Sequence, residues 1–124
     1  MTRVKLRSEA LEDLKRLPSK RLRRVELEWL YRIEREPHLG QRLTWQRSTG
    51  DLSECRKIYF DKGDEPRRDN FVARTKPEQG AGYRIVYRLL PDDKLAEHAE
   101  VIAVGPKFGP GGSVYTMVAR RLDK

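Results

Sequence analysis

The chain has 124 residues, with 37% hydrophobic and 37% charged, which suits one modest core and predicts a single domain over residues 1–124. Its formal net charge of +8 and sequence pI of about 9.9 favour polyanionic or acidic partners. Cys55 is the only cysteine, which excludes an intrachain disulfide, and with His38 and His98 it leaves too few ligands for a zinc site. No apolar run approaches the roughly 20 residues that span a bilayer. We therefore expect a cytoplasmic protein with no membrane partner, no metal and no cofactor.

The first part of the chain predicts a strand followed by two helices. Charged and apolar residues alternate over residues 2–7, as in a half-buried strand. Ser8 is the predicted N-cap of a helix that Pro18 interrupts, and Ser19 that of a second helix ending at Pro37. Apolar residues recur at helical spacing in both segments: Ala10, Leu11, Leu14 and Leu17, then Leu22, Val25, Trp29, Leu30 and Ile33. The two helices form a predicted helical hairpin.

The second part predicts three strands and a final helix. The strands cover residues 54–60, 83–90 and 100–104, and the helix covers residues 114–122. Residues 61–81 are rich in Gly, Pro and charge, which is typical of a long mobile loop or a hairpin extension, and residues 107–113 form a Gly/Pro-rich loop. The order predicts an α+β fold: a small, mostly antiparallel sheet packed against an N-terminal helical hairpin, with a C-terminal helix.

Strand periodicity assigns faces to the polar residues. On the strand 54–60, Cys55, Lys57 and Tyr59 share one face, whereas Arg56, Ile58 and Phe60 share the other. On the strand 83–90, Tyr83 and Tyr87 lie on the face opposite Arg84, and we expect both tyrosines in the core. We expect His38 at the surface after a helix-ending proline and His98 in a charged turn, because neither lies on these strands.

Several segments, in their order and spacing, resemble the RelE/ParE toxin superfamily over nearly the whole chain. They are the opening strand with SEALEDL, GDLSECRKIYF (50–60), GYRIVYRL (82–89) and VIAVGPK…VY (101–115) with the terminal Ala-Arg-Arg-Leu. Members are toxins of toxin–antitoxin pairs; the RelE type cuts mRNA in the ribosomal A site, and the ParE type poisons DNA gyrase. The resemblance implies an endoribonuclease whose partners are a cognate antitoxin, the ribosome with its mRNA and, through the antitoxin, operator DNA.

The resemblance also implies catalytic positions. Lys57 matches the first of two family lysines that activate the 2′-hydroxyl and hold phosphate, and Tyr59 stands in place of the second. We therefore expect Lys57 to be the general base, with Tyr59 as the alternative. Arg84 matches the arginine that contacts the scissile phosphate. Lys107 stands where an arginine commonly acts as leaving-group acid or phosphate clamp, and Tyr115 matches a tyrosine that stacks on a base.

Three of these positions also have a structural interpretation. Lys57 could be an exposed lysine on the sheet, Arg84 could form a cross-strand salt bridge, and Tyr115 could pack the last helix. A basic cluster spans the helical turn, and it could contact rRNA phosphates or the antitoxin, or be a solvated face. Its members are Lys15, Arg16, Lys20, Arg21, Arg23 and Arg24. The competing functions are a ParE-like gyrase inhibitor and, because Tyr59 and Lys107 depart from the family pattern, a catalytically weak antitoxin-binding homologue.

Overall fold

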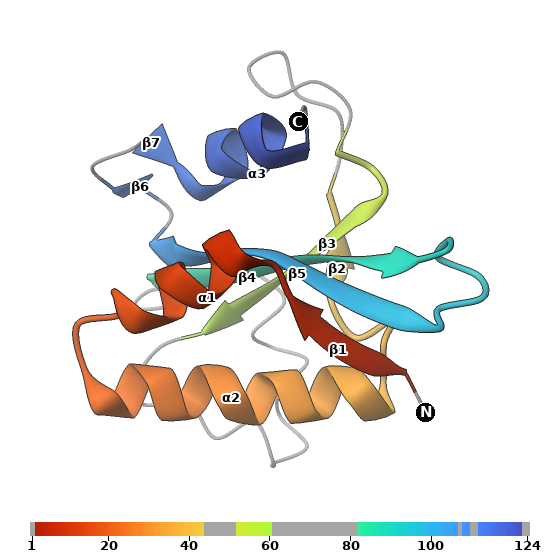
Figure 1. Cartoon of the computed structure of the whole chain (residues 1–124), viewed down its shortest axis with the longest axis horizontal. Coiled ribbons are helices and arrows are strands. Elements are labelled where there is room, and N and C mark those ends of the chain that lie inside the picture. Colours follow the sequence, from red (N-terminus) through yellow and green to blue (C-terminus); the bar gives the residue numbers. More distant parts are fainter. Residues whose placement is uncertain (1, 44–51, 61–81, 107, 110–111, 123–124) are drawn as a thin grey trace.

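A central sheet with helices on both of its faces organises the chain (Figure 1). The computed structural model describes residues 2–43, 52–60, 82–106, 108–109 and 112–122. In chain order the elements are β1 (Arg3–Leu6), α1 (Ser8–Lys15), α2 (Lys20–Arg35), β2 (Gln41–Arg42), β3 (Cys55–Phe60), β4 (Tyr83–Leu90), β5 (His98–Pro106), β6 (Phe108–Gly109), β7 (Gly112–Ser113) and α3 (Val114–Leu122). The predicted α+β class is confirmed.

The main sheet has the strand order β1-β5-β4-β3-β2. Only the β1–β5 pair is parallel among these strands, and the other three pairs are antiparallel, so the predicted mostly antiparallel sheet is confirmed. The β4–β5 register shifts after Val86, so that Val86 faces Ala103 while Tyr87 faces Val101. This β-bulge places Ile102 and Ala103 together on one face, whereas strict alternation would separate them.

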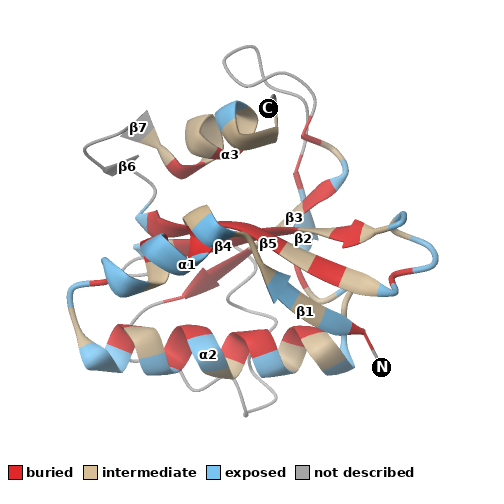
Figure 2. Cartoon of the chain, in the orientation of Figure 1, coloured by how far each residue is buried: buried red, intermediate tan, exposed pale blue. Residues whose placement is uncertain are grey.

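One face of the sheet is covered by α1 and α2, which bring the apolar stripes of the predicted hairpin onto β3, β4 and β5. Trp29 and Ile33 of α2 join Ile58, Ile85 and Val101 in the larger apolar cluster. The Ser19 hydroxyl accepts a hydrogen bond of 3.1 Å from the Leu22 amide, so the predicted cap of α2 is confirmed. Figure 2 shows the buried residues of α2 on the side turned toward the sheet.

The opposite face carries a smaller apolar cluster under α3. Val114 and Val118 of α3 pack there with Val86, Ile102 and Ala103. The smaller cluster covers only part of this face, and charged and phenolic side chains occupy another part of it.

The structure corrects several boundaries. Arg7, and not Ser8, is the N-cap of α1; its amide still donates to the Val101 carbonyl, so strand and helix meet without a capping side chain. The predicted loop 107–113 contains the short β6–β7 pair. Strand β2 was not predicted, and the half-buried His98 begins the largely buried strand β5 rather than lying in a turn.

Two further predictions fall on parts of the chain that are not covered. The loop 61–81 and Lys107 both lie outside the described residues. Within the described residues, no helix combines the length and apolar character needed to cross a membrane.

Candidate functional site

Four of the five predicted catalytic residues meet on the sheet face that α3 covers. Lys57 and Tyr59 project from β3, and Arg84 lies directly opposite Tyr59 in the β3–β4 ladder. Tyr115 lies in the first turn of α3 and packs against the smaller apolar cluster. Residues from two strands and a helix, far apart in sequence, therefore form one group.

Cations surround the Tyr59 ring. The guanidinium carbon of Arg84 lies 4.2 Å from the ring centroid, and the Lys57 Nζ lies 5.2 Å from it. The same Lys57 Nζ is 5.8 Å from the Tyr115 ring centroid. Tyr59 and Arg84 are buried, at 3% and 4% exposure, so these cation–π contacts form with little water between the groups.

The two tyrosines of the group differ in acidity. Burial alone would raise the pKa of Tyr59, but a hydrogen bond with Lys57, the charges of Lys57 and Arg84, and a hydrogen bond with Tyr115 together lower it below its usual 10.0. Burial, together with the nearby Tyr59, raises the pKa of Tyr115 to about 12. Two like groups with separated acidities can divide the roles of proton acceptor and proton donor.

Open space lies beside Arg84. On the β5 side, the cross-strand partner of Arg84 is Gly105. A Cβ atom built on Gly105 would meet no atom of the described residues within 4 Å. Because directly opposed residues share a face of the sheet, this space adjoins the guanidinium. A glycine here leaves room for a ligand group where a larger residue would fill it.

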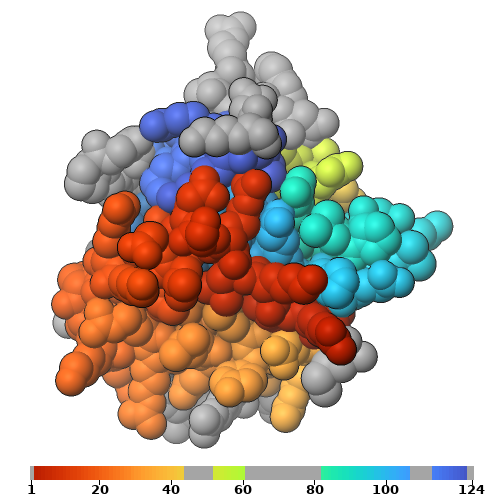
Figure 3. Space-filling view, viewed as in Figure 1, coloured from red at the N-terminus to blue at the C-terminus, as the bar shows by residue number. Residues whose placement is uncertain are grey.

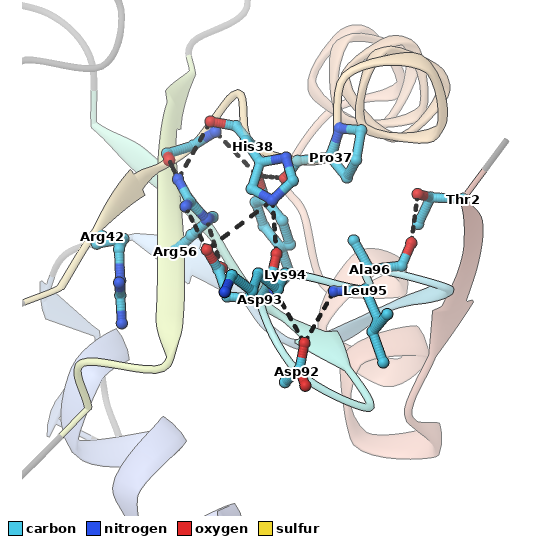
Figure 4. Close-up of polar contacts among 12 residues, drawn as sticks. Thr2, Pro37, His38, Arg42, Arg56, Asp92, Asp93, Lys94, Leu95 and Ala96 are labelled. Carbon is cyan, nitrogen blue, oxygen red and sulfur yellow. Dashed lines mark hydrogen bonds and ion pairs between the residues drawn. The ribbon is translucent and has the colours of Figure 1, made fainter.

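Strand β3 is held from its other face by a network of hydrogen bonds (Figure 4). Arg56 donates to both carboxylate oxygens of Asp93, at 2.9 and 2.8 Å, and to the Gly40 carbonyl at 2.7 Å. The Tyr87 hydroxyl accepts from the Gly40 amide at 2.9 Å. A Cβ on Gly40 would approach that hydroxyl to 2.8 Å, so the network requires glycine there. The network fixes the backbone that carries Lys57 and Tyr59.

Helix α3 is anchored at both ends. At its start, the Ser113 hydroxyl accepts a 3.1 Å hydrogen bond from the Thr116 amide. At its end, Arg121 donates to both carboxylate oxygens of Asp13 on α1, at 2.6 and 3.0 Å. Asp13 is buried and also accepts from the Val104 amide at 3.0 Å. These contacts hold Tyr115 against the sheet.

The structure does not bring the six cations of the predicted basic cluster into this group. They lie at the end of α1, in the turn and in the first turns of α2, on the other side of the sheet from α3. Five of them are exposed, whereas Arg23 is half-buried and donates to the Leu17 carbonyl at 3.1 Å. The turn lies toward the end of β5, at the left of Figure 1.

Sequence reasoning missed three residues that shape the site: Asp13, Arg121 and Gly105. Asp13 lies on the same helical stripe as Ala10 and Leu17, and an acid at a core position is a signal for a buried partner. The identity of that partner, Arg121, was not available from spacing. In the described part of the chain, no group of three or more His, Cys, Asp or Glu residues is placed to hold a metal ion.

Comparison with known proteins places the fold. No protein-family model matches the sequence, and no curated protein matches it either. Solved structures do match. The chain resembles an arginine-to-alanine double mutant of the E. coli toxin RelE in the free state, with 19% identity, a TM-score of 0.57, and 98% of this chain and 97% of that chain covered.

Two further structures agree with this match. The isolated E. coli RelE toxin gives 18% identity and a TM-score of 0.56, covering 98% of this chain and 99% of that chain. The RelBE2 toxin–antitoxin complex of Mycobacterium tuberculosis gives 20% identity and a TM-score of 0.53, covering 85% of this chain and 96% of that chain. The chain therefore has a RelE-like fold.

Proposed function

We propose that this chain is the toxin of a toxin–antitoxin pair and an endoribonuclease that cleaves mRNA in the ribosomal A site. The observation that carries the proposal is the grouping of Lys57, Tyr59, Arg84 and Tyr115 on one face of a RelE-like sheet. In the proposed reaction the 2′-oxygen attacks the adjacent phosphorus, the bond to the 5′-oxygen breaks, and a cyclic phosphate and a 5′-hydroxyl form.

Arg84 is the proposed phosphate-binding residue. Its guanidinium presents paired donors to phosphate oxygens and stays charged, so it can stabilise the charge that grows in the transition state. The open space at Gly105 lies next to it and can admit the phosphate. Since Arg84 is stacked on Tyr59 at 4.2 Å, its position is set before substrate binds.

Tyr59 is the proposed general base, supported by Lys57. The lowered pKa of Tyr59 increases the fraction of phenolate that can accept the 2′-hydroxyl proton. Lys57, within 5.2 Å of the ring, stabilises that phenolate. The raised pKa of Tyr115 keeps its hydroxyl protonated, so Tyr115 can donate a hydrogen bond or a proton, or stack on an unpaired base.

The remaining functional assignments follow from the same proposal. Lys107 is a proposed second phosphate contact. The cluster Lys15, Arg16, Lys20, Arg21, Arg23 and Arg24 is a proposed contact for rRNA phosphates. The partners are the ribosome with its mRNA, a cognate antitoxin and, through it, operator DNA, in the cytoplasm. Because Arg84 and Lys57 supply positive charge, the proposed reaction needs no metal or cofactor.

The test is cleavage of a defined message by the purified protein in a translating extract, with and without ribosomes. We expect new mRNA 5′ ends only when ribosomes are present and the protein carries Arg84. Translation arrest with intact message would contradict the proposal, and so would a parallel supercoiling assay in which the protein stalls gyrase cleavage complexes. A protein that neither cleaves the message nor stalls gyrase would be a catalytically weak homologue. In that case, the double substitution Tyr59→Lys with Lys107→Arg should raise cleavage.

A further inference from the structure

The outer edge of β1 is the feature from which we draw a further inference. β1 is the last strand of the main sheet, and among the described residues no strand pairs with its other side. The Arg3 and Arg7 amides donate toward β5, to the Glu97 and Val101 carbonyls at 3.2 and 3.1 Å. Because backbone groups alternate in direction along a strand, those of Val4 and Leu6 face the open edge.

A hollow accompanies this edge. It has a volume of about 420 Å³ and is lined by Thr2, Arg3, Val4 and Lys5 of the strand region and by Glu34 of α2. Figure 3 shows β1 at the surface between α1 and α2 on one side and the strands of the sheet on the other. An extended peptide could therefore reach the edge and occupy the hollow, adding a strand to the sheet.

The side chains of β1 specify what kind of strand would fit. Arg3 and Lys5 are exposed, and by alternation they lie on the face of the sheet opposite Val4 and Leu6. Val4 and Leu6 are half-buried against the larger apolar cluster. One face of an added strand would thus meet two cations, and its other face would meet an apolar border.

We propose that β1 binds an extended segment of a partner protein in which acidic and apolar residues alternate. The acidic side chains would pair with Arg3 and Lys5, and the apolar ones would cover Val4 and Leu6, where Glu34 disfavours another acid. A second copy of this chain fits less well, because two β1 strands would oppose cations with cations. The inference does not depend on RNA cleavage.

The test uses the full-length protein and a short end-blocked peptide in which glutamate and valine alternate. We expect the peptide to slow hydrogen exchange of the Val4 and Leu6 amides, while the Arg3 and Arg7 amides, which already bond to β5, change little. Two further peptides carry N-methyl groups, one on its glutamates and the other on its valines. Only one of these two sets of amides can face β1, so one methylated peptide should bind and the other should not.

Charge is tested by variants of the protein. Arg3→Glu with Lys5→Glu should weaken binding of the glutamate–valine peptide about tenfold and favour a lysine–valine peptide. The matched control, Lys15→Glu with Lys20→Glu, changes net charge equally at exposed positions away from β1 and should leave the affinity nearly unchanged.

Three results would overturn the proposal. Equal binding of the two methylated peptides would exclude strand pairing, and equal weakening by both pairs of variants would reduce the interaction to general charge attraction. Slow, concentration-dependent exchange of the Val4 and Leu6 amides without any peptide would show that the edge pairs with a second copy of this chain.

Discussion

The two faces of the main sheet differ in the side chains that they bury. The face under α1 and α2 holds the larger apolar cluster, in which Trp29, Ile33 and Ile85 are fully buried. The face under α3 holds a smaller cluster, and beside it Tyr59 and Arg84 are buried as well. Apolar burial on the first face offsets the cost of keeping ionisable groups out of water on the second.

Glu26 and Tyr59 show how the surroundings decide the effect of burial. Glu26 of α2 is fully buried, neither of its carboxylate oxygens has a hydrogen-bond partner among the described residues, and burial raises its pKa to about 8. Tyr59 is almost as buried, yet Lys57 and Arg84 outweigh that burial and lower its pKa. Burial without partners favours a neutral group, and burial beside cations favours an anion.

The largest effect is expected from Arg84→Ala on the α3 face. Loss of the guanidinium should lower the cleavage rate about a thousandfold, because charge in the transition state loses its fixed partner. Single-turnover cleavage of ribosome-bound message measures this effect. The matched control is Arg88→Ala on the same strand, since Arg88 donates to Glu100 at 2.8 Å; equal losses in the two variants would remove Arg84 from the proposed mechanism.

The next effect tests the α2 face through Glu26→Gln. Because the folded-state pKa of Glu26 lies above its ordinary value of 4.5, its protonation stabilises the fold below about pH 4.5, and that stability is lost as pH rises toward 8. Near neutral pH the loss is about 3 kcal/mol, which glutamine should avoid. Urea denaturation at several pH values measures it. An equal pH dependence in the two proteins would contradict a neutral Glu26.

The variant Tyr59→Phe tests the second of the two buried groups, Tyr59, whose pKa is lowered where that of Glu26 is raised. The cleavage rate of the native protein should rise with pH through the lowered pKa of Tyr59, and the variant should lose this rise along with about thirtyfold to a hundredfold of the rate. Tyr115→Phe, the matched control, should keep the rise, because the pKa of Tyr115 is about 12. A pH profile unchanged by Tyr59→Phe would leave Lys57 as the base.

The smallest effects come from the two helix caps. Ser19→Ala and Ser113→Ala each remove a side-chain hydrogen bond at a helix start and should each cost about 1 kcal/mol of stability. Only Ser113→Ala should also slow cleavage, because α3 carries Tyr115. Thermal unfolding temperatures and cleavage rates are measured on both variants. Equal cleavage rates in the two variants would indicate that the position of α3 does not affect the cleavage reaction.

Local patterns predicted much of the fold. The alternation in YRIVYRLL predicted β4 and predicted that Arg84 and Tyr87 lie on opposite faces of the sheet. The polar residue Ser19 predicted the start of α2. The same period of two placed Lys57 and Tyr59 together. These features depend on neighbours in sequence, so the sequence alone is sufficient to predict them.

Features that depend on distant contacts were missed. The pairing of β1 with β5 and the ion pair between Asp13 and Arg121 join residues about a hundred positions apart. Ser8 was a plausible cap, but the Arg7 amide bonds to the Val101 carbonyl, and Arg7 is the N-cap of α1. Glu26 lies on the stripe of α2 between Leu22 and Leu30, so helical periodicity could have predicted its burial.

The measurement that tests the central claim most directly is a map of mRNA 5′ ends after brief expression of the native protein and of Arg84→Ala in cells. The proposed function predicts new ends within translated regions for the native protein and none for the variant. Growth arrest by the native protein with an unchanged pattern of 5′ ends would contradict it.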